Sequence, residues 1–273
     1  MRLPRQTAPR YVDVDGGRLY AETAGAGRDL LLVHSGITDL RMWDGQFAHF
    51  SAHFRVTRFD MRGFGRSTAV TGPYSHVDDL ARVIAALGLE RPRVVAASLG
   101  GRVALDLALR SPEVIERLLL VGPAVGGARF TDTALRACWA EMSAAWEAGD
   151  VETAIELETR FWINGPGRPD GGAAPAVLAR VLEMQRRIVE LLPADDDDPE
   201  LAEPFAALDR LGELSLPVLV VVGAHDVSDI HHNAAAIGAA VEGAEVVTLP
   251  DSGHLPNLEL EAEFNRLALA FLG

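Results

Sequence analysis

Short, nearly continuous apolar runs recur along the chain and are separated by more polar segments. Each run has the length of a β-strand and lacks the apolar–polar alternation of a strand with one face in solvent. This pattern is typical of strands that are buried on both faces, as in parallel sheets. The runs lie at residues 30–33, 94–97, 118–121, 218–222 and 246–249.

Helical patterns fill several of the intervals between these runs. Apolar side chains recur every three or four positions in residues 77–87, 101–109 and 262–272, which gives a helix one apolar face. Ahead of the first run, residues 11–14 and 19–21 flank Asp15, Gly16 and Gly17, a sequence typical of a β-hairpin. Strands that alternate with helices predict an α/β fold, with a mostly parallel sheet and helices on both of its faces.

Residues 128–213 interrupt this alternation. They contain helical patterns but no convincing strand, a Gly- and Pro-rich piece at residues 165–175 and an acidic run at residues 195–198. We interpret the segment as a helical insertion into an α/β core made of residues 1–127 and 214–273. The acidic run is interpreted as a solvated loop, because four adjacent carboxylates cannot all converge on one metal ion.

Composition and charge narrow the possible functions. The chain has 273 residues, of which 48% are hydrophobic and 23% charged, the profile of an ordinary globular protein. Its formal net charge of −14 opposes binding to nucleic acid or to an anionic membrane, because both attract clustered cations. Every basic residue is arginine, and the missing lysine amine excludes Schiff-base chemistry and a P-loop. We expect a small-molecule substrate as partner, and a monomer or homodimer as assembly.

Cysteine content and hydropathy bear on the compartment. Cys138 is the only cysteine, so no internal disulfide can form, and the residue is expected to be inert packing. The sequence has no segment typical of a signal peptide and no apolar run of membrane-spanning length. The expected location is therefore the cytoplasm.

Ser98 stands between an apolar run and a helical pattern. It follows residues 94–97 and precedes Leu99, Gly100 and Gly101, which predicts a strand, a tight turn and a helix in that order. A serine hydroxyl attacks well only when it is exposed, aimed and deprotonated, and a sharp turn of small residues can present it above a sheet edge. The motif Gly-x-Ser-x-Gly is met except that Ala96 replaces the first glycine. Taken alone, this match also fits an ordinary loop serine.

Two further polar residues follow apolar runs in the same way. Asp226 comes after residues 218–222, and His254 comes after residues 246–249. The carboxyl ends of parallel strands share one edge of the sheet, so these side chains and Ser98 are expected to converge there. Separately, Asp226 also fits the N-cap of a following helix, and His254 fits a surface histidine. Their joint placement, in the order serine, aspartate, histidine, favours a catalytic triad.

The oxyanion formed when the serine attacks a carbonyl needs two backbone donors. The N–H of Leu99, directly after the nucleophile, is expected to be one of them. The other is expected from Gly36, which follows the first parallel strand and lets the backbone approach closely. The N–H of Ile37 is a near competitor, since a one-residue change in the loop path exchanges the two. His34, in the same loop, is expected to brace it.

The chain resembles the α/β-hydrolase superfamily over essentially its whole length. The resemblance rests on ordered motifs: LLVHSG at residues 31–36, FDMRGFGRS at 59–67, ASLGG at 97–101, GAHD at 223–226 and GH at 253–254. Residues 36–44 are also similar to the corresponding part of 3-oxoadipate enol-lactonases and related carboxylic-ester hydrolases. The resemblance implies a serine hydrolase acting on an ester or lactone. It also implies that residues 60–67 form a structural turn braced by Arg62 and Ser67, not a phosphate-binding loop.

In this family an inserted segment typically covers the active site, so residues 128–213 are expected to form a helical cap. Trp139, Met142 and Trp146 share one apolar helical face, and Trp162 adds aromatic surface. We interpret the face first as the core of the cap; facing the site instead, it would favour an apolar or aromatic acyl group. The candidate substrate pocket consists of Ile37, Trp43, Trp139, Met142, Trp146 and Trp162.

Two other functions remain open. Related enzymes use the same triad to hydrolyse a carbon–carbon bond in a vinylogous 1,5-diketone, and the sequence does not separate this reaction from ester hydrolysis. A ligand-binding or biosynthetic protein that keeps the fold with little hydrolysis is suggested by Ala96. No cofactor and no metal are expected: His231 and His232 are adjacent, point apart on a helix and have no cysteine or carboxylate set beside them.

Overall fold

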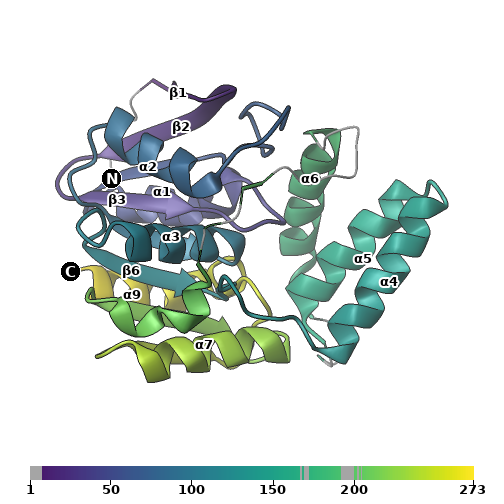
Figure 1. Cartoon of the computed structure of the whole chain (residues 1–273). Coiled ribbons are helices and arrows are strands. Elements are labelled where there is room, and N and C mark those ends of the chain that lie inside the picture. The colour runs from purple at the N-terminus through teal and green to yellow at the C-terminus, as the bar shows by residue number, and fades with distance from the viewer. Residues whose placement is uncertain (1–7, 167, 169–171, 192–199, 202, 204) are drawn as a thin grey trace.

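A computed structural model describes residues 8–166, 168, 172–191, 200, 201, 203 and 205–273. Within this part of the chain, the strands form an eight-stranded sheet in the order β1-β2-β4-β3-β5-β6-β7-β8 (Figure 1). The strands are β1 (Arg10–Val14), β2 (Gly17–Gly25), β3 (Asp29–Val33), β4 (Arg55–Phe59), β5 (Arg93–Ala97), β6 (Arg117–Val121), β7 (Val218–Gly223) and β8 (Glu245–Leu249). The acidic run at residues 195–198 lies outside the described residues.

Strand pairing follows the predicted pattern. From β4 through β3 to β8, neighbouring strands are parallel, and the apolar runs correspond to β3, β5, β6, β7 and β8. β1 and β2 form the expected antiparallel hairpin, with Val14 opposite Gly17. β2 is antiparallel to β4 as well. The prediction of a mostly parallel α/β sheet is confirmed.

β4 is the strand that the apolar pattern did not reveal. It lies between β2 and β3, yet its sequence contains two arginines and a threonine. Arg58 is buried and pairs with Glu22 of β2, with Nη2 2.7 Å from Oε2, and Arg55 pairs with Asp29 of β3. Because charged residues are buried mainly when they are paired, these partners allow a charged strand inside the sheet.

β8 does not show the predicted burial on both faces. It is the last strand of the sheet, and Leu249 is its one buried residue. Val246 is 43% exposed. The prediction was wrong for this strand because an apolar run does not reveal that its strand lies at an edge, where the covering layers are incomplete.

Helices cover both faces of the sheet (Figure 1). α2 (His76–Ala86), α3 (Leu99–Arg110) and α7 (Ser228–Ala240) contribute to a buried cluster on one face, and α1 (Asp44–Phe50) and α9 (Glu261–Leu272) contribute to a second cluster on the other. α2, α3 and α9 are the three helices that the periodicity predicted. The short η1 (Leu40–Trp43) precedes α1, and α8 (Pro256–Glu259) precedes α9.

Residues 128–213 contain α4 (Thr133–Glu147), α5 (Val151–Asn164), α6 (Pro175–Leu191) and the short 3-10 helices η2 (Ala207–Asp209) and η3 (Leu211–Glu213). α4 and α5 pack side by side and stand away from the sheet, with α6 between them and the body (Figure 1). The described residues of this segment form no strand beyond an isolated bridge between Glu200 and Tyr74. Across the described residues, none of the helices combines the length and apolar composition that a membrane crossing requires.

Candidate active site

Ser98 occupies the turn between β5 and α3 in a conformation that few residues with a Cβ adopt. Its φ is 49° and its ψ is −113°, and such strain persists only where the surroundings hold it. The Ser98 N–H donates to the carbonyl oxygen of Val121 at 2.9 Å, and its carbonyl accepts from the N–H of Ala124 at 3.2 Å. The end of β6 therefore holds the turn, while Ser98 itself stays partly exposed.

Small residues around the turn allow this conformation. A side chain at Gly100 would overlap the carbonyl oxygen of His34, and a Cβ on Gly101 would lie 3.2 Å from Cβ of Pro123. Ala96 is fully buried in the core. Its extra methyl group is accommodated there, and Ser98 keeps its positive φ despite the missing glycine.

Asp226 and His254 meet at the same edge of the sheet. Asp226 follows β7, His254 follows β8, and Nδ1 of His254 lies 2.8 Å from Oδ2 of Asp226. The side chain of His254 is 2% exposed and that of Asp226 is 1% exposed, so His254 is not a surface residue. The other oxygen of Asp226 accepts from the N–H of Val227 at 2.8 Å, and Val227, not Asp226, is the N-cap of α7.

Gly122 connects this pair with the serine turn. It directly follows Val121, and a Cβ on Gly122 would lie 3.0 Å from Nδ1 of His254 and 3.1 Å from its Cε1. Ser98 and His254 therefore border the same strand end. Ser98 and His254 both lie in the part of the chain that the structure describes, and no hydrogen bond joins the Ser98 hydroxyl to the imidazole. In serine hydrolases without bound substrate this hydrogen bond is often long, and it shortens when substrate binds.

The two proposed oxyanion donors lie in segments that touch. Thr38 donates to the carbonyl of Ser35 at 3.3 Å, which closes a turn with Gly36 and Ile37 at its centre, so neither central N–H is used in closing it. Leu99 opens α3, and its N–H therefore has no partner within the helix. A Cβ on Gly36 would lie 3.4 Å from Cβ of Leu99.

His34 holds the proposed oxyanion loop, residues 34–38, against the loop after β4. Its Nδ1 lies 2.8 Å from the carbonyl oxygen of Ser35, and its Nε2 accepts from the N–H of Met61 at 2.9 Å. Burial lowers the pKa of His34 to about 4, so the ring is neutral and can donate at one nitrogen and accept at the other. The expectation that His34 braces the loop is confirmed.

Met42 supports the same loop and was not found from the sequence. Its sulfur accepts from the hydroxyl of Thr38 at 2.9 Å and from the N–H of Ser35 at 3.4 Å. The hydroxyls of Ser35 and Thr38 also pair, at 2.9 Å. A methionine in η1 reads as an ordinary apolar residue, so no sequence signal marks its sulfur as an acceptor.

The segment at residues 60–67 is a structural turn after β4, as the resemblance implies. Arg62 donates to both carboxylate oxygens of Asp79 in α2, at 2.9 and 2.8 Å. The hydroxyl of Ser67 donates to the carbonyl oxygen of Asp60 at 2.6 Å and accepts from the N–H of Tyr20 at 2.9 Å. Both bracing residues therefore act within the fold.

Among the predicted pocket residues, Trp162 reaches the site and Trp43 does not. The indole of Trp162 packs on the imidazole of His254, with ring centroids 4.5 Å apart. Trp43 is fully buried and faces Phe264 of α9 at 6.4 Å, in the same core cluster as Ile37. Trp43 ends η1 and is packed inside this cluster, so it has no exposed surface to offer a substrate.

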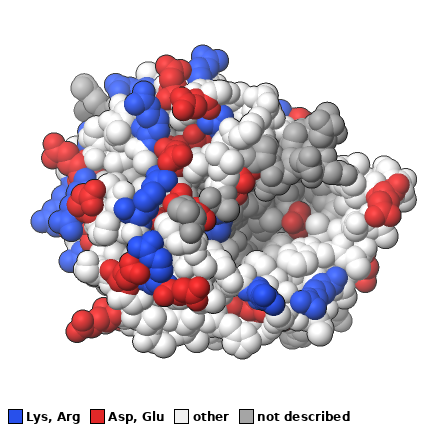
Figure 2. Space-filling model, in the orientation of Figure 1, with Lys and Arg blue, Asp and Glu red and all other residues white. Residues whose placement is uncertain are grey.

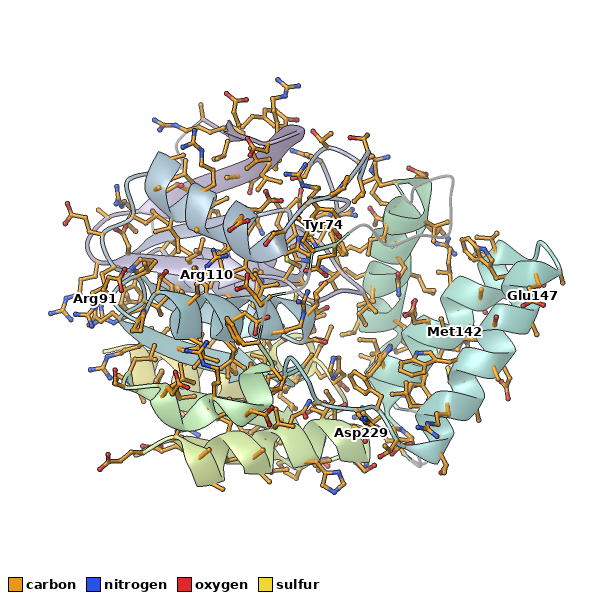
Figure 3. All side chains as sticks on the ribbon, viewed as in Figure 1. Tyr74, Arg91, Arg110, Met142, Glu147 and Asp229 are labelled. Atoms are coloured by element: carbon orange, nitrogen blue, oxygen red, sulfur yellow. The ribbon has the colours of Figure 1, made fainter. Side chains whose placement is uncertain are left out.

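A hollow lies between the α/β body and the α4–α5 pair, and its visible walls are largely uncharged (Figure 2). Met142 of α4 lies on that pair (Figure 3). Trp139 is 38% and Trp146 is 43% exposed, and of the residues of α4 only Leu135 and Cys138 are buried. The first interpretation of these tryptophans as core of the cap is wrong, because α4 is an outer helix.

The base of α4 is tied to the loop region that carries Asp226. Asp229 of α7 accepts from the N–H and hydroxyl of Thr131 at 2.8 and 2.9 Å, and from the N–H of Asp132 at 2.8 Å (Figure 3). Asp132 in turn caps α4 and accepts from the hydroxyl of Ser228 at 2.7 Å. Asp229, which comes shortly after the proposed acid Asp226 in the sequence, therefore anchors the start of the insertion.

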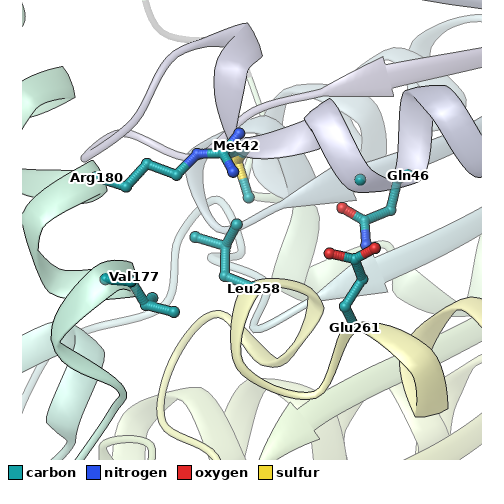
Figure 4. Close-up of a pocket in the computed structure, with 8 residues that line it drawn as sticks. Met42, Gln46, Val177, Arg180, Leu258 and Glu261 are labelled. Atoms are coloured by element: carbon teal, nitrogen blue, oxygen red, sulfur yellow. The ribbon is translucent and has the colours of Figure 1, made fainter.

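A separate cavity of about 130 Å³ lies between α6, α1 and α8 (Figure 4). Met42, Val177 and Leu258 form its apolar wall. Arg180 of α6 borders it and donates to the carboxylate of Asp44 at 2.6 Å. The ion pair attaches α6 to the core beside an incompletely filled apolar contact, and the residues that line the cavity do not include Ser98, Asp226 or His254.

Comparisons with known proteins agree with this architecture. A family model described as the alpha/beta hydrolase fold matches residues 30–259. A pimeloyl-[acyl-carrier protein] methyl ester esterase from Pectobacterium carotovorum is 28% identical, covering 93% of this chain and 98% of that protein. A carboxylesterase from Bacillus subtilis is 26% identical, covering 98% and 89%. The enol-lactonase structure from Burkholderia xenovorans is 26% identical with a TM-score of 0.76, covering 96% and 99%. The chain belongs to the alpha/beta hydrolase fold family.

Proposed function

We propose that this chain is a serine hydrolase that cleaves a small-molecule carboxylic ester or lactone through an acyl-enzyme on Ser98. The observation that carries the proposal is the buried 2.8 Å contact between Asp226 and His254, beside a serine held at a φ of 49° at the same sheet edge. The similarity to ester-acting hydrolases and to an enol-lactonase supports the substrate class.

In the proposed reaction, Ser98 Oγ attacks the carbonyl carbon and passes its proton to Nε2 of His254. The carbon–oxygen bond to the leaving group then breaks as the imidazolium returns that proton to the leaving oxygen. Water repeats the cycle on the acyl-enzyme and releases the acid and the free serine. Asp226 keeps Nδ1 protonated, so that Nε2 is the basic nitrogen, and it stabilises the imidazolium.

The developing oxyanion is proposed to accept from the N–H groups of Leu99 and Gly36. A donor of this kind contributes about 10²- to 10³-fold in kcat in other serine hydrolases. The contact between the two segments supports the pairing. Ile37 remains the alternative second donor, because its N–H belongs to the same turn.

We further propose that residues 128–213 act as a cap over the site. The hollow beside α4 and α5 (Figure 2) and the contact between Trp162 and His254 support this role. The expected acyl group is apolar or aromatic, which the partly exposed indole of Trp139 on α4 and the indole of Trp162 beside His254 support.

A ligand-binding protein without hydrolysis is the weaker alternative. The sequence suggested it because Ala96 replaces the first glycine of the Gly-x-Ser-x-Gly motif. Ala96 is buried in the core, however, and Ser98 keeps its positive φ. Cleavage of a carbon–carbon bond uses the same residues, and no contact in the structure favours it over ester hydrolysis.

The test is covalent labelling by a fluorophosphonate, followed by hydrolysis of a panel of aryl esters, lactones and a vinylogous diketone. We expect one label, on Ser98, and turnover of esters or lactones that Ser98→Ala abolishes. Ser143 is an exposed serine on α4. Ser143→Ala is the matched control and should keep both the label on Ser98 and the turnover. An unlabelled Ser98 together with unchanged turnover in Ser98→Ala would falsify the assignment.

A further inference from the structure

The last turn of α5 is wedged against both loops that carry the proposed acid and base. The carbonyl oxygen of Trp162 accepts from the N–H of His254 at 3.1 Å. A side chain at Gly253 would overlap the carbonyl oxygen of Ile163, and one at Gly165 would overlap the carbonyl oxygen of His225. Two glycines therefore permit a contact so close that α5 cannot shift without moving the residues beside Asp226 and His254.

The indole of Trp162 adds a side-chain contact to this backbone clamp. Its ring centroid lies 4.5 Å from that of the His254 imidazole, with the planes inclined by 40°. His254 is thus held in three places. Asp226 contacts Nδ1 of its imidazole, the carbonyl oxygen of Trp162 in α5 accepts from its backbone N–H, and the indole of Trp162 packs on its ring. The side chain of His254 is 2% exposed, so water reaches little of it.

We propose that Trp162 is a positioning residue for His254: its indole fixes the imidazole toward Ser98 and stabilises the imidazolium that forms when His254 takes the serine proton. The negative face of an aromatic ring attracts a cation, most strongly for tryptophan, and the attraction grows where water is excluded. From the sequence, Trp162 was a candidate for the substrate pocket, with the core of the cap as the first interpretation. The geometry assigns it instead to positioning the proposed base, His254, so α5 contributes to the arrangement of the catalytic residues.

The inference rests on the proposed hydrolase function, and one experiment separates the two. Ser98→Ala tests the hydrolase assignment, whereas Trp162 variants test the role of the indole in an enzyme that is otherwise intact. Unchanged turnover in Ser98→Ala would overturn the hydrolase assignment. Loss of turnover in Ser98→Ala together with wild-type kcat in Trp162→Leu would overturn the role of Trp162 alone.

The main variant is Trp162→Leu, which keeps an apolar side chain without a π face. From the cation–π magnitude we expect kcat to fall about 3- to 30-fold, with KM close to wild type, for acetyl and longer acyl esters alike. Labelling of Ser98 by a small fluorophosphonate should slow by a similar factor. Trp162→Phe, which keeps an aromatic face, should recover most of the loss. Tyr11→Leu, at the far edge of the sheet on β1, is the control and should leave kcat unchanged.

A second series preserves the shape of the side chain. Tryptophan analogues with one, two and three ring fluorines at residue 162 progressively weaken the negative face, so kcat should fall stepwise. Wild-type kcat in Trp162→Leu, a rise in KM that grows with acyl length, or no response to fluorination would overturn the proposal. A rise in KM of that kind would make Trp162 a wall of the substrate pocket.

Discussion

Gly100 lies so close to the carbonyl oxygen of His34 that a side chain at this position would overlap it. The contact joins the first turn of α3, which begins at Leu99 beside Ser98, to the start of the loop with Gly36. The distance between the two proposed oxyanion donors therefore depends on the absence of one Cβ atom.

Gly100→Ala is expected to separate these segments. Overpacking costs about 1 to 3 kcal/mol, and a displacement near 1 Å of a catalytic group can lower kcat about 100-fold. Thermal unfolding and steady-state kinetics measure both effects. Gly72→Ala is the matched control, because a Cβ there meets nothing within 4 Å and should leave stability and kcat unchanged. Equal kcat in the two variants would contradict the prediction.

Asp226→Asn should remove the acid while leaving the shape of the site. Its Oδ2 contacts Nδ1 of His254, and an amide there favours the wrong imidazole tautomer. By analogy with other serine hydrolases, kcat should fall about 10⁴-fold with little change in KM. Asp251→Asn, exposed in the loop before His254, should behave as wild type. The role of Asp226 is refuted if its variant keeps normal kcat.

Met42→Leu tests the sulfur as a support of the oxyanion loop. Leucine keeps the volume, but the buried N–H of Ser35 loses its acceptor, whereas the hydroxyl of Thr38 still has the oxygens of Ser35 as partners. An unsatisfied buried donor costs about 1 to 3 kcal/mol, and kcat should fall more than KM changes. Met184→Leu, equally buried in the same cluster, should lose less than about 1.5 kcal/mol and keep kcat. Identical kinetics for the two variants would exclude this role.

His76 predicts a pH dependence of stability. Burial, with a smaller contribution from nearby Arg102, lowers the pKa of His76 from 6.5 to about 3. Because the unfolded chain then binds the extra proton, the stability contributed by neutral His76 is present above pH 6.5 and is lost as the pH falls through 6.5 toward 3. Between pH 7.5 and 4.5, wild type should lose about 2 to 3 kcal/mol more than His76→Phe. Denaturant titrations at both pH values measure the difference, and parallel losses would disprove it.

Much of the candidate site could be predicted because its residues follow strands directly. Ser98, Asp226 and His254 each come after an apolar run, and the shared edge of a parallel sheet then brings them together. Met42, Gly122 and Gly165 could not be found in this way. They act through a sulfur acceptor or a close approach, and neither produces a periodic pattern.

Local patterns along the chain are sufficient to predict the α/β class, the hairpin and the order of the motifs, because periodicity and turn composition are properties of neighbouring residues. They do not reveal that β4 enters the sheet between β2 and β3, because its arginines depend on partners in other strands. Nor do they separate Trp43, packed under the sheet, from Trp162, packed on His254. Their neighbours in sequence do not show what either tryptophan contacts, and only the path of the folded chain, with glycines where α5 meets the two loops, brings one of them to the imidazole.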